Sequence, residues 1–85
     1  MAPAEDADDL YASCMTALDD ERHLEAESLC RRATVLEPNH PSAWNSLGNA
    51  LTELGRWNDA EAAYRRQIEI DPGEITARTI AEHLY

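Results

Sequence analysis

Three histidines are the side chains in this sequence best suited to bind a metal or to exchange a proton near neutral pH. They are His23, His40 and His83. Metal sites usually pair two ligands at a short helical spacing such as i, i+4, and none of these histidines has a cysteine or another histidine at such a spacing. We therefore expect surface or interface histidines, with no metal and no cofactor.

The acidic run Asp19-Asp20-Glu21 is the second group that could do chemistry, because neighbouring carboxylates can hold a cation or act as an acid–base pair. A calcium-binding loop needs a glycine between spaced acids, and this run has none. The run lies between two expected helices, where carboxylates solvate the turn and favour the next helix N-terminus. The chain also lacks a Ser/His/Asp order, a glycine-rich phosphate loop and a Cys-x-x-Cys motif, so no enzyme is predicted.

The clearest helical pattern lies in residues 41–72. Its first half has apolar residues at the spacing of one helix face, namely Trp44, Leu47, Leu51 and Leu54. Gly55 follows as a helix stop. Asn58 is then expected to cap a second helix, with Glu61 in the capping-box position, and Pro72 ends it. The segment is predicted to form a helical hairpin.

This spacing resembles the tetratricopeptide repeat, a 34-residue pair of antiparallel helices. The residues that carry the resemblance are Trp44, Leu47, Gly48, Ala60, Tyr64 and Pro72. Leu51 stands where the family has an aromatic residue. Gly48 and Ala60 are small at the positions where the two helices are expected to approach each other closely.

A weaker copy of the pattern precedes this segment at the same offset. Pro38 and Ala26 stand 34 residues before Pro72 and Ala60. The expected helices of this first hairpin lie near residues 7–20 and 23–36. The expected fold is all-α, with two stacked tetratricopeptide hairpins and a C-terminal capping helix in a short right-handed solenoid. Its parts are an acidic lead-in (1–6), a degenerate repeat (7–40), a well-matched repeat (41–74) and the capping helix (75–85).

The net charge of the chain limits the classes of partner that it is expected to bind. It has 17 acidic residues against 7 basic ones, all arginine, and a net charge of −10. A surface this acidic repels phosphate, so neither nucleic acid nor membrane is an expected partner. No apolar run reaches 18 residues and no basic-then-apolar segment opens the chain, so a cytoplasmic location is expected.

The repeat alignment predicts where the two cysteines and the two tryptophans lie. Cys14 and Cys30 fall at close-contact positions on the two helices of the first repeat, and a disulfide is open to them if their Cα atoms lie within about 7 Å. The alternative is a pair of small buried free thiols. We favour free thiols, because a cytoplasmic protein keeps them reduced. Trp44 and Trp57 are both expected in the core.

The family resemblance implies a protein-interaction module, in which the first helix of each repeat lines a concave groove. The helix phase predicts that the groove presents Tyr11, Met15, Leu18, Asn45, Asn49, Thr52, Thr79 and His83. The amides of Asn45 and Asn49, one helical turn apart, could hydrogen-bond the backbone of an extended segment. Tyr11 and Met15 could contact an apolar side chain of that segment. Since acids lie nearby without a base, a protein or peptide segment that is neutral or basic is the expected ligand.

One alternative function stays open. The chain could instead be a self-associating scaffold, a homodimer formed through the solenoid ends or the capping helix. A subclass of the family grips a C-terminal carboxylate with Lys, Arg and Asn side chains. This chain does not match that subclass, because it has Tyr11, Met15, Ser46, Thr76 and Ile80 at those positions.

Overall fold

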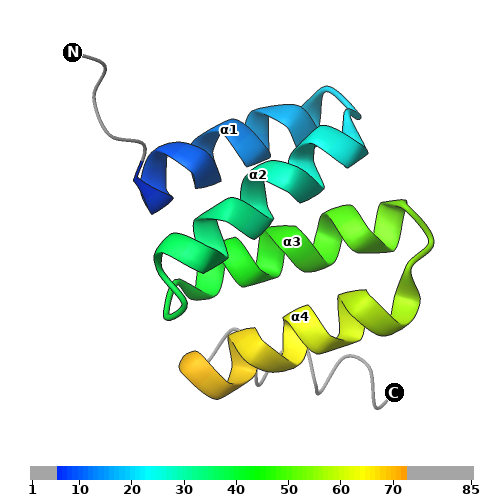
Figure 1. The fold of residues 1–85 in the computed structure, drawn as a ribbon. Coiled ribbons are helices and arrows are strands. Elements are labelled where there is room, and N and C mark those ends of the chain that lie inside the picture. The colour runs from blue at the N-terminus through cyan, green and yellow to red at the C-terminus, as the bar shows by residue number, and fades with distance from the viewer. Residues whose placement is uncertain (1–5, 73–85) are drawn as a thin grey trace.

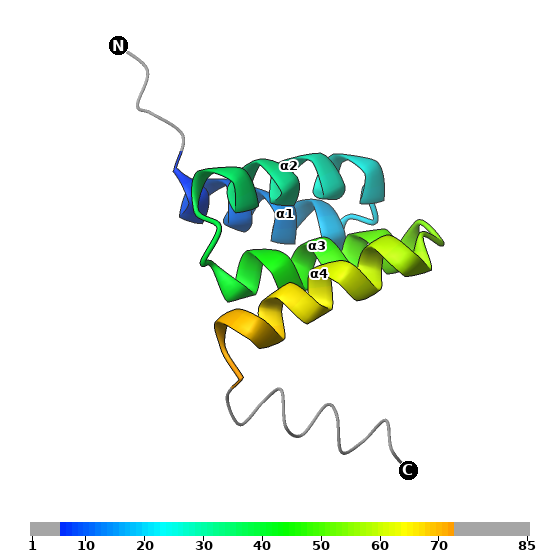
Figure 2. The same cartoon turned by 60° about the horizontal axis from the view of Figure 1, so that its bottom comes forward.

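A computed structural model describes residues 6–72, which form four α-helices. They are α1 (Ala7–Asp19), α2 (His23–Leu36), α3 (Pro41–Glu53) and α4 (Trp57–Ile70). α1 and α3 run in one direction and α2 and α4 return in the other, giving two antiparallel hairpins (Figures 1 and 2). α3 also packs against both helices of the first hairpin, which stacks the two units. The predicted all-α fold is confirmed, while the capping helix expected over 75–85 lies outside the described residues.

The helix boundaries follow local signals in the sequence. Asp6 caps α1 by accepting a hydrogen bond from the Asp9 backbone N–H at 2.8 Å. Pro41 is the first residue of α3, where its missing N–H has no helical partner to lose. Pro72 follows the end of α4, as predicted. Among residues 6–72, no helix is long and apolar enough to cross a membrane.

The turns within the two hairpins have the same geometry at an offset of 34 residues. In the first turn the Arg22 N–H donates to the Ala17 carbonyl at 2.8 Å, and in the second the Arg56 N–H donates to the Leu51 carbonyl at 2.9 Å. Each bond satisfies a carbonyl at the helix C-terminus that lacks an intrahelical donor. The 34-residue offset that relates the two repeats in sequence therefore also relates the backbone hydrogen bonds of their turns.

Both turns also place one residue in the left-handed backbone region. That residue is Gly55 in the second hairpin, at φ 76°, and Glu21 in the first, at φ 60°. Glycine reaches this region freely, whereas a residue with a Cβ is disfavoured there by about 1–2 kcal/mol. The first turn is therefore strained where the second is not.

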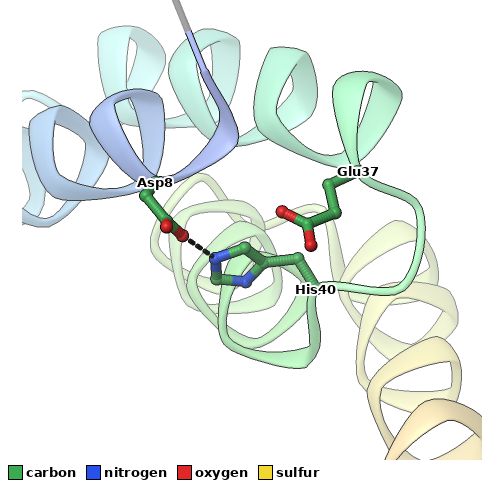
Figure 3. A group of neighbouring side chains, drawn as sticks. All are labelled: Asp8, Glu37 and His40. Carbon is green, nitrogen blue, oxygen red and sulfur yellow. Dashed lines mark hydrogen bonds and ion pairs between the residues drawn. The ribbon is translucent and has the colours of Figure 1, made fainter.

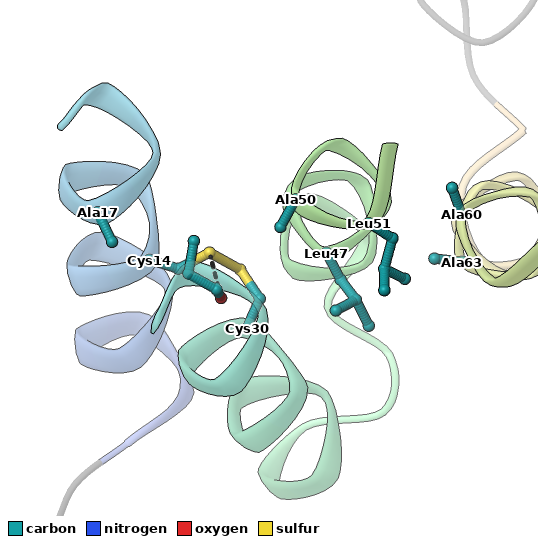
Figure 4. Packing of buried hydrophobic residues seen from close by; sticks show 9 residues of the cluster. Cys14, Ala17, Cys30, Leu47, Ala50, Leu51, Ala60 and Ala63 are labelled. Carbon is teal, nitrogen blue, oxygen red and sulfur yellow. Dashed lines mark hydrogen bonds between the residues drawn. A yellow bond between two sulfur atoms is a disulfide. The ribbon is translucent and has the colours of Figure 1, made fainter. Parts of the chain in front are cut away.

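The core is built mostly from small side chains, which allow the helices to approach closely. The buried face of α1 consists of Ala7, Leu10, Cys14 and Ala17, at 5%, 3%, 0% and 1% exposure. Across the second hairpin, Leu51 of α3 faces alanines of α4 (Figure 4). The main cluster comprises Cys14, Ala17, Ala26, Cys30, Leu47, Ala50, Leu51, Ala60 and Ala63.

Cys14 and Cys30 form a disulfide that joins α1 to α2, with their Cα atoms 5.5 Å apart (Figure 4). Our expectation of free thiols is wrong: the hairpin brings the two positions within bonding distance. Both cysteines are fully buried. In the chain-entropy model, a cross-link of this sequence separation, 16 residues, stabilises the folded state by about 3 kcal/mol.

Gly48 of α3 lies directly against the Tyr64 ring of α4. A Cβ atom at this position would lie 2.6 Å from Cε1 of Tyr64, well inside van der Waals contact. The Tyr64 ring thus crosses the Gly48 backbone, and its hydroxyl donates to Oδ1 of Asn49 at 2.6 Å. The predicted need for a small residue at Gly48 is explained by this ring.

Two details of α4 differ from the sequence prediction. The helix starts at Trp57 and its N-cap is Arg56, which makes no side-chain cap bond, so Asn58 is not the cap. The helix starts earlier because the Arg56 carbonyl already accepts from the Ala60 N–H at 3.0 Å. Trp57 is 66% exposed rather than in the core, since it lies at the first position of α4, ahead of that helix's buried alanines.

Candidate functional site

The α1 half of the predicted groove forms one face at the junction with α3. Tyr11 is partly buried, and its ring centroid lies 5.2 Å from that of His40. Met15 is 38% exposed, and its sulfur accepts a hydrogen bond from the buried Ser46 hydroxyl at 3.1 Å. Leu18 packs against the main core cluster. The structure therefore gathers an aromatic ring and a thioether beside α3, both of them accessible in part.

The α3 half of the groove is tied to α4. The Asn45 side-chain amide donates to Oε1 of Gln67 at 3.0 Å, and Asn49 accepts from the Tyr64 hydroxyl. The Thr52 hydroxyl donates to the Gly48 carbonyl at 2.8 Å. The bonds of Asn45 and Asn49 hold both side-chain amides in place, and each bond uses one of the two polar atoms of its amide. We call the set Tyr11, Met15, Leu18, Asn45, Asn49 and Thr52 the α1–α3 face; Thr79 and His83 lie outside the described residues.

Asp8, Glu37 and His40 form a cluster that the sequence spacing did not indicate (Figure 3). One ligand atom from each lies within 4.8 Å of the others, an arrangement that could hold a metal ion. His40 Nδ1, however, accepts the Ala43 backbone N–H at 3.1 Å and so caps α3. The proton of the neutral ring is then on Nε2, which lies 3.0 Å from Asp8 Oδ1.

Metal binding at this cluster would conflict with the cap of α3. Coordination through His40 Nε2 requires the ring proton to move to Nδ1, where it would meet the Ala43 N–H and remove the cap bond. Asp8 is also 84% exposed, so its carboxylate is well solvated without an ion. The cluster is therefore a structural link from α1 to α3, made through His40, whose ring bonds to Asp8 and to the first turn of α3.

A second network joins the two hairpins through Glu27 of α2. Its Oε2 accepts from Arg31 at 2.7 Å and from Arg56, before α4, at 2.8 Å. The Arg31 hydrogen bond lowers the pKa of the Glu27 carboxyl, and the charge of Arg56 lowers it further, while partial burial opposes both. Arg56 also bonds Asp59 through Nε and Nη2, at 3.2 and 2.9 Å.

A cleft of about 500 Å³ opens beside this network, between α2, α3 and α4. We call it the arginine cleft. Its apolar floor and its basic rim consist of Trp44, Leu47, Leu51, Arg31, Arg56 and Arg66. No residue of the α1–α3 face lines it. Sequence reasoning missed this site, because Glu27 and Arg56 are far apart in the sequence and only the stacked hairpins bring them together.

Comparison with known proteins places this geometry in a family. The family model described as Tetratricopeptide repeat matches residues 17–83. Tetratricopeptide repeat protein 37 of Xenopus laevis is 38% identical over 56 residues, which is 66% of this chain and 4% of that protein. Small glutamine-rich tetratricopeptide repeat-containing protein 2 of Mycosarcoma maydis is 31% identical over 61 residues, 71% of this chain and 17% of that protein.

Superkiller complex protein 3 of Homo sapiens is 29% identical over 73 residues, which is 86% of this chain and 5% of that protein. The chain thus spans only a small part of each of these three relatives. Two stacked antiparallel hairpins, a shared 34-residue offset and a family match over most of the length agree with one another. The chain belongs to the tetratricopeptide repeat family, whose members are protein-interaction modules built as α-solenoids.

Proposed function

We propose that the α1–α3 face binds a neutral or basic segment of a partner protein. The observation that carries the proposal is the distribution of charge among the helices. α1 and α3 hold four acids and no lysine or arginine, whereas the arginines of the described helices lie on α2 and α4. A basic segment is therefore attracted to the α1–α3 face and an acidic one is repelled.

Tyr11 and Met15 supply an apolar contact surface, which adds to the attraction between charges. Both are partly accessible, and the two lie one helical turn apart on α1. A tyrosine gives a large rigid apolar surface, and a methionine adapts to the shape of the side chain that packs on it. An apolar residue in the bound segment would dock there, while the Asn49 amide nitrogen is oriented by the Tyr64 bond to donate to a passing backbone carbonyl.

The test uses Met15→Lys with Val35→Lys as its matched control. Both changes put a lysine at an exposed apolar position, since Met15 is 38% and Val35 74% exposed, but only Met15 belongs to the α1–α3 face. The probe is a short synthetic peptide in which one leucine is flanked by lysines, titrated into labelled protein and followed by NMR.

We expect peptide-induced shifts on α1 and α3, weakened about tenfold by Met15→Lys and unchanged by Val35→Lys, and smaller as salt is raised. Circular dichroism checks that both variants remain folded. Equal binding by Met15→Lys and the unmodified chain, or shifts confined to α2 and α4, would place the interface on another surface.

A further inference from the structure

The arginine cleft differs in charge from helices α1 and α3, which carry acids and no arginine. Arg31, Arg56 and Arg66 line it against two lining acids, Glu27 and Asp59, which leaves one positive charge in excess. Half of the six arginines in residues 6–72 gather here, in a chain whose net charge is −10. An anionic group that reaches this cleft therefore meets a local excess of positive charge on an otherwise acidic molecule.

The arginines of the cleft differ in how far their donors are used. Arg56 is bound by both Glu27 and Asp59, through all three of its guanidinium nitrogens. Arg31 gives Nη2 to Glu27, and Arg66 lies 3.7 Å from the Glu69 carboxylate, which is longer than a hydrogen bond. Each guanidinium carries five N–H donors, so within residues 6–72 Arg31 and Arg66 keep donors for an incoming carboxylate.

The floor between these arginines is apolar and fixed in position. Trp44 is held by its indole N–H, which donates to the Pro38 carbonyl at 2.8 Å, and the ring packs against the core cluster. Leu47 and Leu51 close the bottom of the cleft at 2% and 1% exposure. An inserted apolar side chain would contact an aromatic surface that does not need to be ordered on binding.

We propose that the arginine cleft is a second interaction site, which takes an acidic segment of a partner protein and seats one of its apolar side chains on Trp44. Arg31 and Arg66 hold carboxylates on the two sides of the anchor. A protein segment fits better than nucleic acid, because the negative charge of the rest of the chain would oppose an extended phosphate backbone. The chain would then hold a basic segment on one surface and an acidic one on another.

The test compares Arg66→Gln with Arg65→Gln. Both remove one positive charge from α4, and both arginines sit in exposed ion pairs, Arg66 near Glu69 and Arg65 with Glu61. Only Arg66 lines the cleft. The probe is a short synthetic peptide in which one leucine is flanked by glutamates, with inorganic phosphate and the lysine-flanked peptide titrated separately, all followed by NMR of the full chain.

We expect the glutamate peptide to shift the Trp44 indole N–H and the backbone amides of Ala62 and Ala63, with an affinity that falls about fivefold in Arg66→Gln and not in Arg65→Gln. Equal effects of the two variants would show non-specific charge attraction and overturn the proposal. So would a phosphate response equal to that of the peptide, or peptide shifts confined to α1 and α3. Binding of the lysine peptide, read on α1 and α3, tests the α1–α3 face independently.

Discussion

Replacing Gly48 with alanine tests the packing of the second hairpin most directly, because two known effects oppose each other there. Alanine improves the intrinsic helix propensity of α3 by about 1 kcal/mol over glycine. The new Cβ, however, would lie 2.6 Å from Cε1 and 2.8 Å from Cδ1 and Cζ of Tyr64, where carbon atoms normally stay about 3.5–4.0 Å apart. The ring must therefore move.

The expected loss exceeds the gain. Overpacking typically costs about 1–3 kcal/mol, and moving the Tyr64 ring also strains its hydrogen bond to Asn49, which contributes about 0.5–1.5 kcal/mol. After the propensity gain, we expect Gly48→Ala to lower the free energy of unfolding by about 1–2 kcal/mol. For a domain of this size, that corresponds to a fall in Tm of roughly 5–15 °C.

A double-mutant cycle with Tyr64→Ala separates the two effects. With the ring removed, Gly48→Ala should become stabilising by up to about 1 kcal/mol, so the sign of its effect reverses. Tyr64→Phe keeps the ring and removes only the hydroxyl, so Gly48→Ala should still destabilise that variant. Urea and thermal unfolding followed by circular dichroism give the free energies. If Gly48→Ala has the same cost with and without the Tyr64 ring, the close contact is not where the structure places it.

Three further predictions concern the turn, the disulfide and the link between the hairpins. Glu21→Gly should raise the free energy of unfolding by about 0.5–1 kcal/mol by relieving the left-handed backbone, whereas Gly55→Ala should lower it; thermal melts of both decide this. Reducing the Cys14–Cys30 bond should cost about 3 kcal/mol, and an unchanged Tm in reductant would contradict the bond. Glu27→Gln should cost about 1 kcal/mol at neutral pH. The fold lowers the pKa of the Glu27 carboxyl below its ordinary value of 4.5. The stability difference between the unmodified chain and Glu27→Gln should therefore be fully present above about pH 4.5, and it should disappear as the pH falls through the folded pKa.

Much of the local structure can be predicted from the sequence, because the signals act over a few residues. The apolar spacing of α1 gives the buried positions Leu10, Cys14 and Ala17, and Pro41 and Gly55 mark helix ends. The 34-residue offset predicts that the second hairpin repeats the first. The identity of the residues on the α1–α3 face comes from the same helix phase, and their role in binding stays a prediction.

The tertiary structure alone decided the contacts between distant residues. The Asp8–His40 and Glu27–Arg56 pairs each join residues about thirty positions apart, and neither has a spacing that signals it. The Cys14–Cys30 bond was wrongly predicted to be absent, since two cysteines in a sequence do not reveal the distance between their Cα atoms. Helix periodicity depends on each residue's neighbours in the chain. The disulfide, the His40 cap and the arginine cleft depend on how closely small side chains let whole helices pack, and that is a property of the assembled hairpins.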